Sequence, residues 1–309
     1  MWVVRSSAAL ALFALAGCAA LPRPDTVDAL TRPAISAEAA AAVVRHYNSV
    51  SANANARRSD ELMAGVQTGD LLRQTEAAYK ISRLLKKPVT ATPAFTAGSV
   101  GAPEYGSYPM HFVALGNHRL GVWERPSAGE AWRLMYALSV AVPEPTGLHD
   151  IAPTDGAGLV ESPSVAAAKF AELLTVGAKS PYARLFTAAP KVAKFQKNLA
   201  ASHAMAGHDH ILAVTDTFSL NAPPTAFRTS SGEVLAFFTL TNAKEMRPQF
   251  GAMWPVGQDT AAFSTPNHLY RTALTTTTLH QFAIAIPAAK GGKIRVLGFT
   301  TQLVDSGGY

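Results

Sequence analysis

The stretch HQFAIAIPAAKGGKIRVLGF, residues 280–299, predicts the fold class of this chain. Two runs rich in β-branched and aromatic residues flank a loop that contains Pro287, Gly291 and Gly292. Such runs on either side of a glycine-bearing loop indicate an antiparallel hairpin. The stretch GVWERPSAGEAWRLMYAL, residues 121–138, has the same form, with Pro126 opening its loop. We interpret the two stretches as the sign of an internal duplication.

The order of the segments around these hairpins supports that interpretation. In the first half, helical periodicity over 36–57, 60–66 and 70–87 precedes alternating runs at 89–98, 109–116, 119–125 and 131–142. In the second half, helices at 162–177 and 190–206 precede strands at 210–220, 225–232, 233–242, 272–287 and 293–304. Asn48, Asn53 and Asn55 on the other faces of the first helix are unusual but need no special role.

We therefore expect an α+β fold of two similar units, each with helices followed by an antiparallel sheet. The first unit spans 36–142 and the second spans 162–309, joined by a linker at 143–161 that is rich in proline and glycine. A helix packed across a curved antiparallel sheet is the arrangement of cystatin-like and NTF2-like cone folds. The halves resemble that arrangement in order and length.

The first residues indicate where the protein works. Residues 8–17, AALALFALAG, form an apolar run too short to span a bilayer. The residues Leu15 to Cys18 resemble the lipobox of bacterial lipoproteins, in which the cysteine thiol receives a diacylglycerol. We expect a signal peptide at 1–17, a lipidated Cys18 and a tether at 18–35, which place the protein on the extracytoplasmic face of a cell membrane. The alternative is a plain secretory leader.

Composition excludes several classes of function. Cys18 is the only cysteine, so an exported domain with Cys18 lipidated has no disulfide, no cysteine-bound zinc and no cysteine nucleophile. The formal net charge is +6, and its Lys and Arg residues do not form the basic stripe of a nucleic-acid binder. Attraction to an anionic membrane or wall surface is the more plausible use of this excess.

Catalytic motifs are missing from the sequence. There is no G-x-S-x-G, no S-x-x-K with K-T-G, and neither phosphate-binding glycine motif. The ionisable strand residues that we consider for acid–base chemistry are His111, Glu124, Asp216 and His280. His203, His208 and His210 resemble the start of a metal site, but no carboxylate completes it. We expect no cofactor and no metal.

The long segment 250–272 interrupts the second set of strands. Segments of this length are often functional, and this one has Trp254, Phe263, His268 and Tyr270. These four residues are our candidate ligand or partner surface. The alternative is that they plug the rim of the core.

The chain also resembles a known family. The stretches at 43–80, 228–242 and 280–299 are similar to those of uncharacterised secreted or lipid-anchored actinobacterial proteins with a large domain of unknown function, over residues 36–305. The resemblance implies a location in the cell envelope and no established activity.

Three functions stay open on this basis. The first is a lipid-anchored, non-enzymatic envelope protein that binds another envelope protein, a wall polymer or a lipid. The second is a carrier or sensor of a small ligand, held in the interior of the cone fold. The third is an enzyme that acts on wall or lipid substrates.

The lipobox gives the first prediction. The Cys18→Ser change removes the thiol that acyl transfer requires, so we expect loss of palmitate labelling and release of the protein from the membrane fraction. Metabolic labelling and fractionation of intact cells measure both effects. A Cys18→Ser variant that is held on the membrane as firmly as the natural chain would contradict the anchor.

Overall fold

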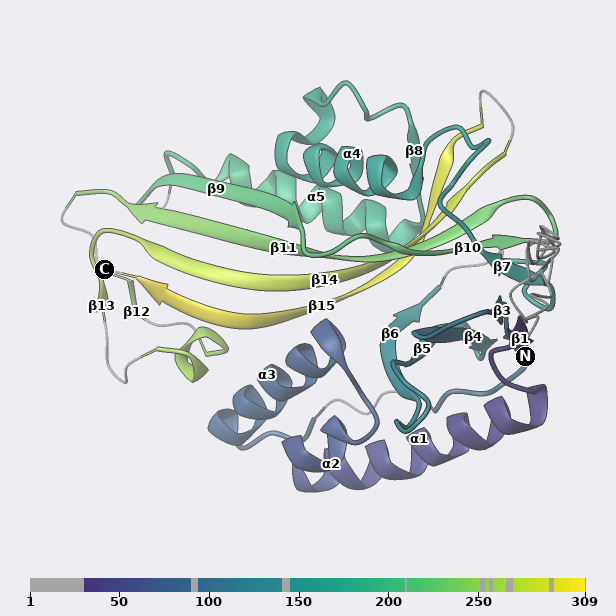
Figure 1. Cartoon of the computed structure of the whole chain (residues 1–309). Helices are drawn as coiled ribbons and strands as arrows, with labels where there is room; N and C mark the ends of the chain where they lie inside the picture. The colour runs from purple at the N-terminus through teal and green to yellow at the C-terminus, as the bar shows by residue number, and fades with distance from the viewer. Residues whose placement is uncertain are drawn as a thin grey trace, which may run out of the picture. The chain divides into compact units, whose positions relative to one another are not determined.

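Two β-sheets stacked face to face form the centre of the fold, and helices cover their outer faces (Figure 1). The computed structural model describes residues 31–308 except 90–93, 141–144, 209, 251–253, 256–257, 265–268 and 289–291. Cys18 and the predicted signal peptide lie outside the described residues. None of the described helices is both long and apolar enough to cross a membrane.

The first sheet has four antiparallel strands in the order β2-β4-β5-β6, which are β2 (Ser99–Gly101), β4 (Met110–Gly116), β5 (Arg119–Arg125) and β6 (Arg133–Ser139). Its outer face carries α1 (Ala37–Arg57), α2 (Asp60–Ala64) and α3 (Gly69–Leu85). Ser36 and Ser59 cap the first two helices, because each side chain accepts a hydrogen bond from a backbone N–H of the first turn.

The second sheet is larger and carries two helices. Its order is β7-β10-β11-β14-β15-β8, and β9 also pairs with β11. The strands are β7 (Ile151–Pro153), β8 (Phe186–Ala188), β9 (Ile211–Leu220), β10 (Thr225–Thr229), β11 (Val234–Pro248), β14 (Leu274–Ile286) and β15 (Ile294–Gly308). β8 joins β15 in parallel, whereas the other pairs of this sheet are antiparallel. On its outer face lie α4 (Pro163–Val176) and α5 (Pro190–Ala204).

Shorter elements complete the described chain. β1 (Arg32–Pro33) pairs with β3 (Glu104–Tyr105), and β12 (Trp254–Pro255) pairs with β13 (Leu269–Tyr270). Two 3-10 turns span Gly177–Lys179 and Thr260–Ala262.

The apolar side chains separate into three layers. Trp123, Phe112 and Phe95 pack with the inner sides of α1–α3, and the rings of Phe112 and Trp123 stack 5.0 Å apart. Between the sheets, Val113 and Val122 meet Phe237 and other residues of the second sheet. Beneath α4, Phe170 packs against the outer face of the second sheet. The side chains alternate along the strands, so each sheet buries both of its faces.

The two sheets contact each other directly where β6 crosses β14 and β15. Val140 forms a backbone bridge with Gly298. Gln281 is 0% exposed, and its side-chain amide accepts from the Ala137 N–H at 3.3 Å and donates to the Met135 carbonyl at 2.9 Å. The amide therefore replaces a strand neighbour for β6, and it ties the two sheets together at their centre.

The predicted α+β class is confirmed. The predicted pair of cone-like units is not confirmed, because the two sheets share one core instead of each closing around its own helix. The predicted linker 143–161 contains β7, which pairs with β10 of the second sheet. The unit boundaries themselves stay a prediction.

One predicted strand is wrong in its described part. Residues 94–98 lie outside any strand, and β2 begins only at Ser99. The cause is Asn48 of α1, whose side chain binds both the N–H and the carbonyl of Phe95, at 3.0 and 2.8 Å. These two bonds occupy the backbone groups that a neighbouring strand would use.

The close approach of the sheets gives the second prediction. A Cβ at Gly298 would lie 2.1 Å from the Ser139 carbonyl oxygen, so Gly298→Ala pushes the sheets apart and we expect a loss of about 1–3 kcal/mol in the free energy of unfolding. Chemical denaturation measures this loss. The control is Gly307→Ala on the same strand, where a Cβ would meet no atom closer than 3.7 Å. Equal stability of the two variants would contradict the tight contact.

Candidate functional site

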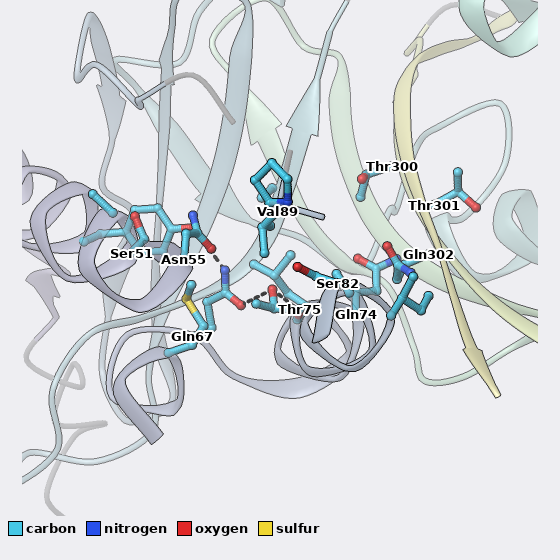
Figure 2. A pocket seen from close by; sticks show the side chains of 18 of the residues that line it. Ser51, Asn55, Gln67, Gln74, Thr75, Ser82, Val89, Thr300, Thr301 and Gln302 are labelled. Carbon is cyan, nitrogen blue, oxygen red and sulfur yellow. Dashed lines mark hydrogen bonds between the residues drawn. The ribbon is translucent and has the colours of Figure 1, made fainter. Parts of the chain in front are cut away.

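A cavity of about 740 Å³ lies between α1, α3 and β15, and we call it the helix–sheet cavity (Figure 2). This volume falls within the range of about 300–1,000 Å³ that small-molecule sites occupy. Figure 2 shows side chains from all three elements around it. The labelled polar ones on these elements are Ser51, Asn55, Gln74, Thr75, Ser82, Thr300, Thr301 and Gln302.

Helical spacing explains why the helices present polar groups there. Asn48, Ser51 and Asn55 recur three and four residues apart on α1, so they share one stripe of its surface. The neighbouring stripe, which includes Val44 and Tyr47, is buried against the first sheet. One side of α1 therefore packs in the core, and the adjacent side lines the cavity.

Gln67, in the turn between α2 and α3, organises the wall of the cavity. Its side chain is 4% exposed, donates through Nε2 to the Tyr47 hydroxyl at 3.0 Å, and accepts through Oε1 from the Thr75 hydroxyl at 2.7 Å. The dashed lines in Figure 2 include these contacts. Gln67 thus fixes the orientation of α1 and α3 relative to each other.

Two further amides are only partly used within the described chain. Asn55 accepts through Oδ1 from the Tyr79 hydroxyl at 2.7 Å, and Gln74 donates through Nε2 to the Leu279 carbonyl at 2.8 Å. The second half of each amide has no hydrogen bond to another described residue. A held amide with one half uncommitted is suited to bind a ligand.

The charged residues of the lining are Lys87, Arg119, Lys191 and Asp259. Arg119, at the start of β5, is 7% exposed, and its guanidinium carbon lies 3.8 Å from the centre of the Phe95 ring. Burial lowers the pKa of Arg119, and the nearby Tyr47 partly counteracts that shift.

The aromatic residues predicted as a partner surface are placed differently from one another. Tyr270 is 1% exposed, so its ring supports the segment from within, and its hydroxyl bonds that of Ser264. Phe263 is half-buried under the ammonium group of Lys80, 4.6 Å from the ring centre. The side chain of Trp254 and all of His268 lie outside what the structure describes. A surface that includes Trp254 and His268 stays a prediction.

The structure brings His111 and Glu124 together. They face each other on β4 and β5, with Nε2 of His111 3.7 Å from Oε1 of Glu124. The interaction with His111 lowers the pKa of Glu124. The Tyr105 hydroxyl is 3.5 Å from Nδ1 of His111, and burial raises the pKa of Tyr105 to about 12.

Asp216 and His203 form a second pair, beneath the end of α5. The buried Asp216 carboxylate bonds Nε2 of His203 at 2.8 Å and accepts from Nδ2 of Asn242 at 2.8 Å. Both carboxylate oxygens are therefore occupied. His208 and His210 are exposed, and no cluster of metal-binding His, Cys, Asp or Glu residues occurs within the described ranges.

His280 lies close by, in an aromatic environment. The residue is 2% exposed and contacts the rings of Phe195, Phe218 and Phe282. Neither ring nitrogen has a partner among the described residues. Burial lowers the pKa of His280 to about 4, so the ring is neutral and serves as a packing element.

Sequence reasoning missed the helix–sheet cavity. Asn48 and Asn55 are unusual residues on the predicted first helix, but helical periodicity alone indicates no role for them. Both residues lie on the same stripe of the helix as Ser51. This stripe contains amide and hydroxyl side chains, whereas a solvent-exposed face of a helix usually contains charged ones.

Comparison with known proteins supplies a family. A family model described as a domain of unknown function (DUF8094) matches residues 31–308. No curated protein and no solved structure matches the chain.

The buried imidazole gives the third prediction. The unfolded chain protonates His280 near pH 6.5 and the folded chain only near pH 4, so stability falls as pH drops through this window, by about 3 kcal/mol from this residue. His280→Phe removes this loss. Denaturant unfolding of both proteins between pH 7 and pH 4 measures the difference. His46→Gln, a change at an exposed histidine, is the control and leaves the pH dependence in place.

Proposed function

Since the chain belongs to the family of the domain of unknown function DUF8094, we propose its function from the geometry of the helix–sheet cavity. The protein is a lipid-anchored, non-enzymatic component of a cell envelope that binds a small polar ligand, or the end group of a wall polymer, in this cavity. The observation that carries the proposal is that amide and hydroxyl residues of α1, α3 and β15 line one hollow of about 740 Å³, which is partly open to solvent.

The lining favours a ligand rich in hydroxyl groups. Amides and hydroxyls both donate and accept hydrogen bonds, and a sugar hydroxyl does the same, so the two sets are complementary. Leu71, Ala78, Ile81 and Val89 add apolar contacts to the lining. A saccharide presents C–H groups between its hydroxyls, and these groups suit such contacts.

The charged residues of the lining favour binding over catalysis. Among the described residues that line the cavity, Asp259 is the one carboxylate and none is a histidine. Acid–base chemistry needs two titratable groups with separated pKa values in one site. The pair of His111 and Glu124 borders a different hollow, beside Tyr105 and Phe227.

The location rests on the sequence. The residues Leu15 to Cys18 support a lipid anchor, and the described fold begins at β1 (Arg32–Pro33), near the end of the predicted tether 18–35. A protein held at the membrane surface in this way meets wall polymers, lipids and exported metabolites. The cavity is suited to their polar parts.

The fourth prediction tests ligand binding. Thr300 is half-buried on β15 and its side chain lies on the cavity side of the strand in Figure 2, so Thr300→Trp fills space that a ligand needs and is expected to weaken binding at least tenfold, with melting curves to verify that the variant folds. Binding to an array of wall-derived and other saccharides, followed by calorimetry of the best ligand, measures the effect. Thr217→Trp, at an exposed position of β9 remote from the lining, is the control. Failure of the natural chain to bind any saccharide, or equal binding by both variants, would overturn the proposal.

A further inference from the structure

We infer that the exposed side of α5 binds a linear polyanion, a polymer of the cell envelope that carries phosphate or carboxylate groups along its length. The inference goes beyond the helix–sheet cavity and takes only the location of the partner from the proposed function. Three observations support it. The positive charge of the chain is concentrated in one segment, the fold arranges three lysines of that segment in a row, and these charges form no ion pair within the described chain.

One segment holds almost all of the excess positive charge. Residues 173–208, between Glu172 and Asp209, contain five of the 27 basic residues and none of the 21 acidic ones, so the remainder of the chain has 22 basic and 21 acidic residues. All five are exposed, and they are Lys179, Arg184, Lys191, Lys194 and Lys197. Like charges gathered on one part of a surface attract ligands of the opposite charge.

The fold arranges three of these residues in a row along α5. A helix turns by about 100° per residue, so Lys191, Lys194 and Lys197 lie within about 120° of its circumference and span about 9 Å of its axis. The large apolar residues of α5 point elsewhere and pack in the core beneath the helix; they are Val192, Phe195 and Leu199. The row therefore faces solvent, on the outer side of the large sheet.

The charges of the row are available to a partner. None of the five cations forms an ion pair with a described residue. Lys191 donates to the Phe299 carbonyl at 3.5 Å, and that partner is uncharged. The buried carboxylate of Asp216, beneath the end of α5, is already bonded to His203. No described carboxylate therefore forms an ion pair with the row.

The surroundings of the row suit a polymer better than a membrane surface. A helix that lies in a membrane interface places large apolar side chains in the lipid, but the exposed residues of α5 other than lysine are a proline, an asparagine and alanines. Met205, which follows α5, is a single exposed apolar residue.

The point where the chain enters the fold gives a second argument for a polymer. Ile35, just after β1, packs in the layer of α1–α3, whereas α5 packs on the other side of the large sheet. The predicted tether therefore joins the layer opposite to α5. A polymer that extends away from the membrane can reach the α5 side.

Calorimetry with polymers of known charge tests the inference. The protein is the full chain with Cys18→Ser, so that no acyl group binds lipid. The probes are polyphosphate, polyglutamate, neutral polyethylene glycol, and phosphatidylcholine vesicles with and without phosphatidylglycerol. We expect at least one polyanion to bind with an affinity that falls as salt rises, and the two polyanions tell a phosphate partner from a carboxylate one. Binding of neither polyanion overturns the inference, as does tighter binding to the anionic vesicles. Neither result affects the saccharide array that tests the cavity.

A pair of double variants tests the site on α5. Lys194→Gln with Lys197→Gln removes two charges from the row, and we expect roughly tenfold weaker binding of the polyanion and a smaller salt dependence. Lys191 is left unchanged because it also lines the cavity. The matched control is Lys86→Gln with Lys293→Gln, which removes the same charge from exposed positions outside the segment. Melting curves verify that both variants fold. Equal weakening by the two variants would mean general charge attraction and would overturn the α5 site.

Discussion

The structure depends on the close contact between β6 and the long hairpin of β14 and β15. At Gly298 the backbones approach so closely that no Cβ fits, and Gln281 supplies side-chain hydrogen bonds where a strand neighbour would. This contact fixes where the small sheet sits on the large one. Because β14 and β15 have 13 and 15 residues while β6 has 7, the large sheet extends beyond the small one. α3 contacts the part of the large sheet that extends beyond the small one, and Gln74 of α3 donates a hydrogen bond to it. The helix–sheet cavity lies beside this contact.

The fold class was predictable from sequence, whereas the stacking of the sheets was not. The hairpin at 280–299 and the helix at 36–57 depend on local alternation and helical spacing, which a single sequence displays. The contact of Gln281 with β6 joins residues that are more than 140 positions apart, and no periodicity indicates it. The pair of cones was expected from the order and length of the helices and strands in each half, and that order does not indicate whether the two sheets pack on each other.

The cavity was hidden for a related reason. Its wall comes from the first helix, the third helix and the last strand, and each contribution resembles an ordinary solvated surface when taken alone. Asn48 shows the ambiguity well, because its side chain holds the backbone of Phe95 and thereby places the ring under Arg119. The same residue also broke the strand predicted at 89–98. The error in the fold and the omission in the site therefore have one cause, a side chain that takes the place of a backbone partner.

The polar side chains fall into two groups, those that stabilise the packing and those that are available to a ligand. On the outer side of the large sheet, Asp216 is fully used by His203 and Asn242, and His280 is a neutral ring among aromatic ones. Groups committed in this way stabilise the packing of α5 and leave nothing for a ligand. On the side of α1 and α3, both ends of the Gln67 amide are used, whereas the Asn55 and Gln74 amides beside the cavity are only half used. A ligand site needs both kinds of group, since fixed residues hold the orientation that uncommitted donors and acceptors require.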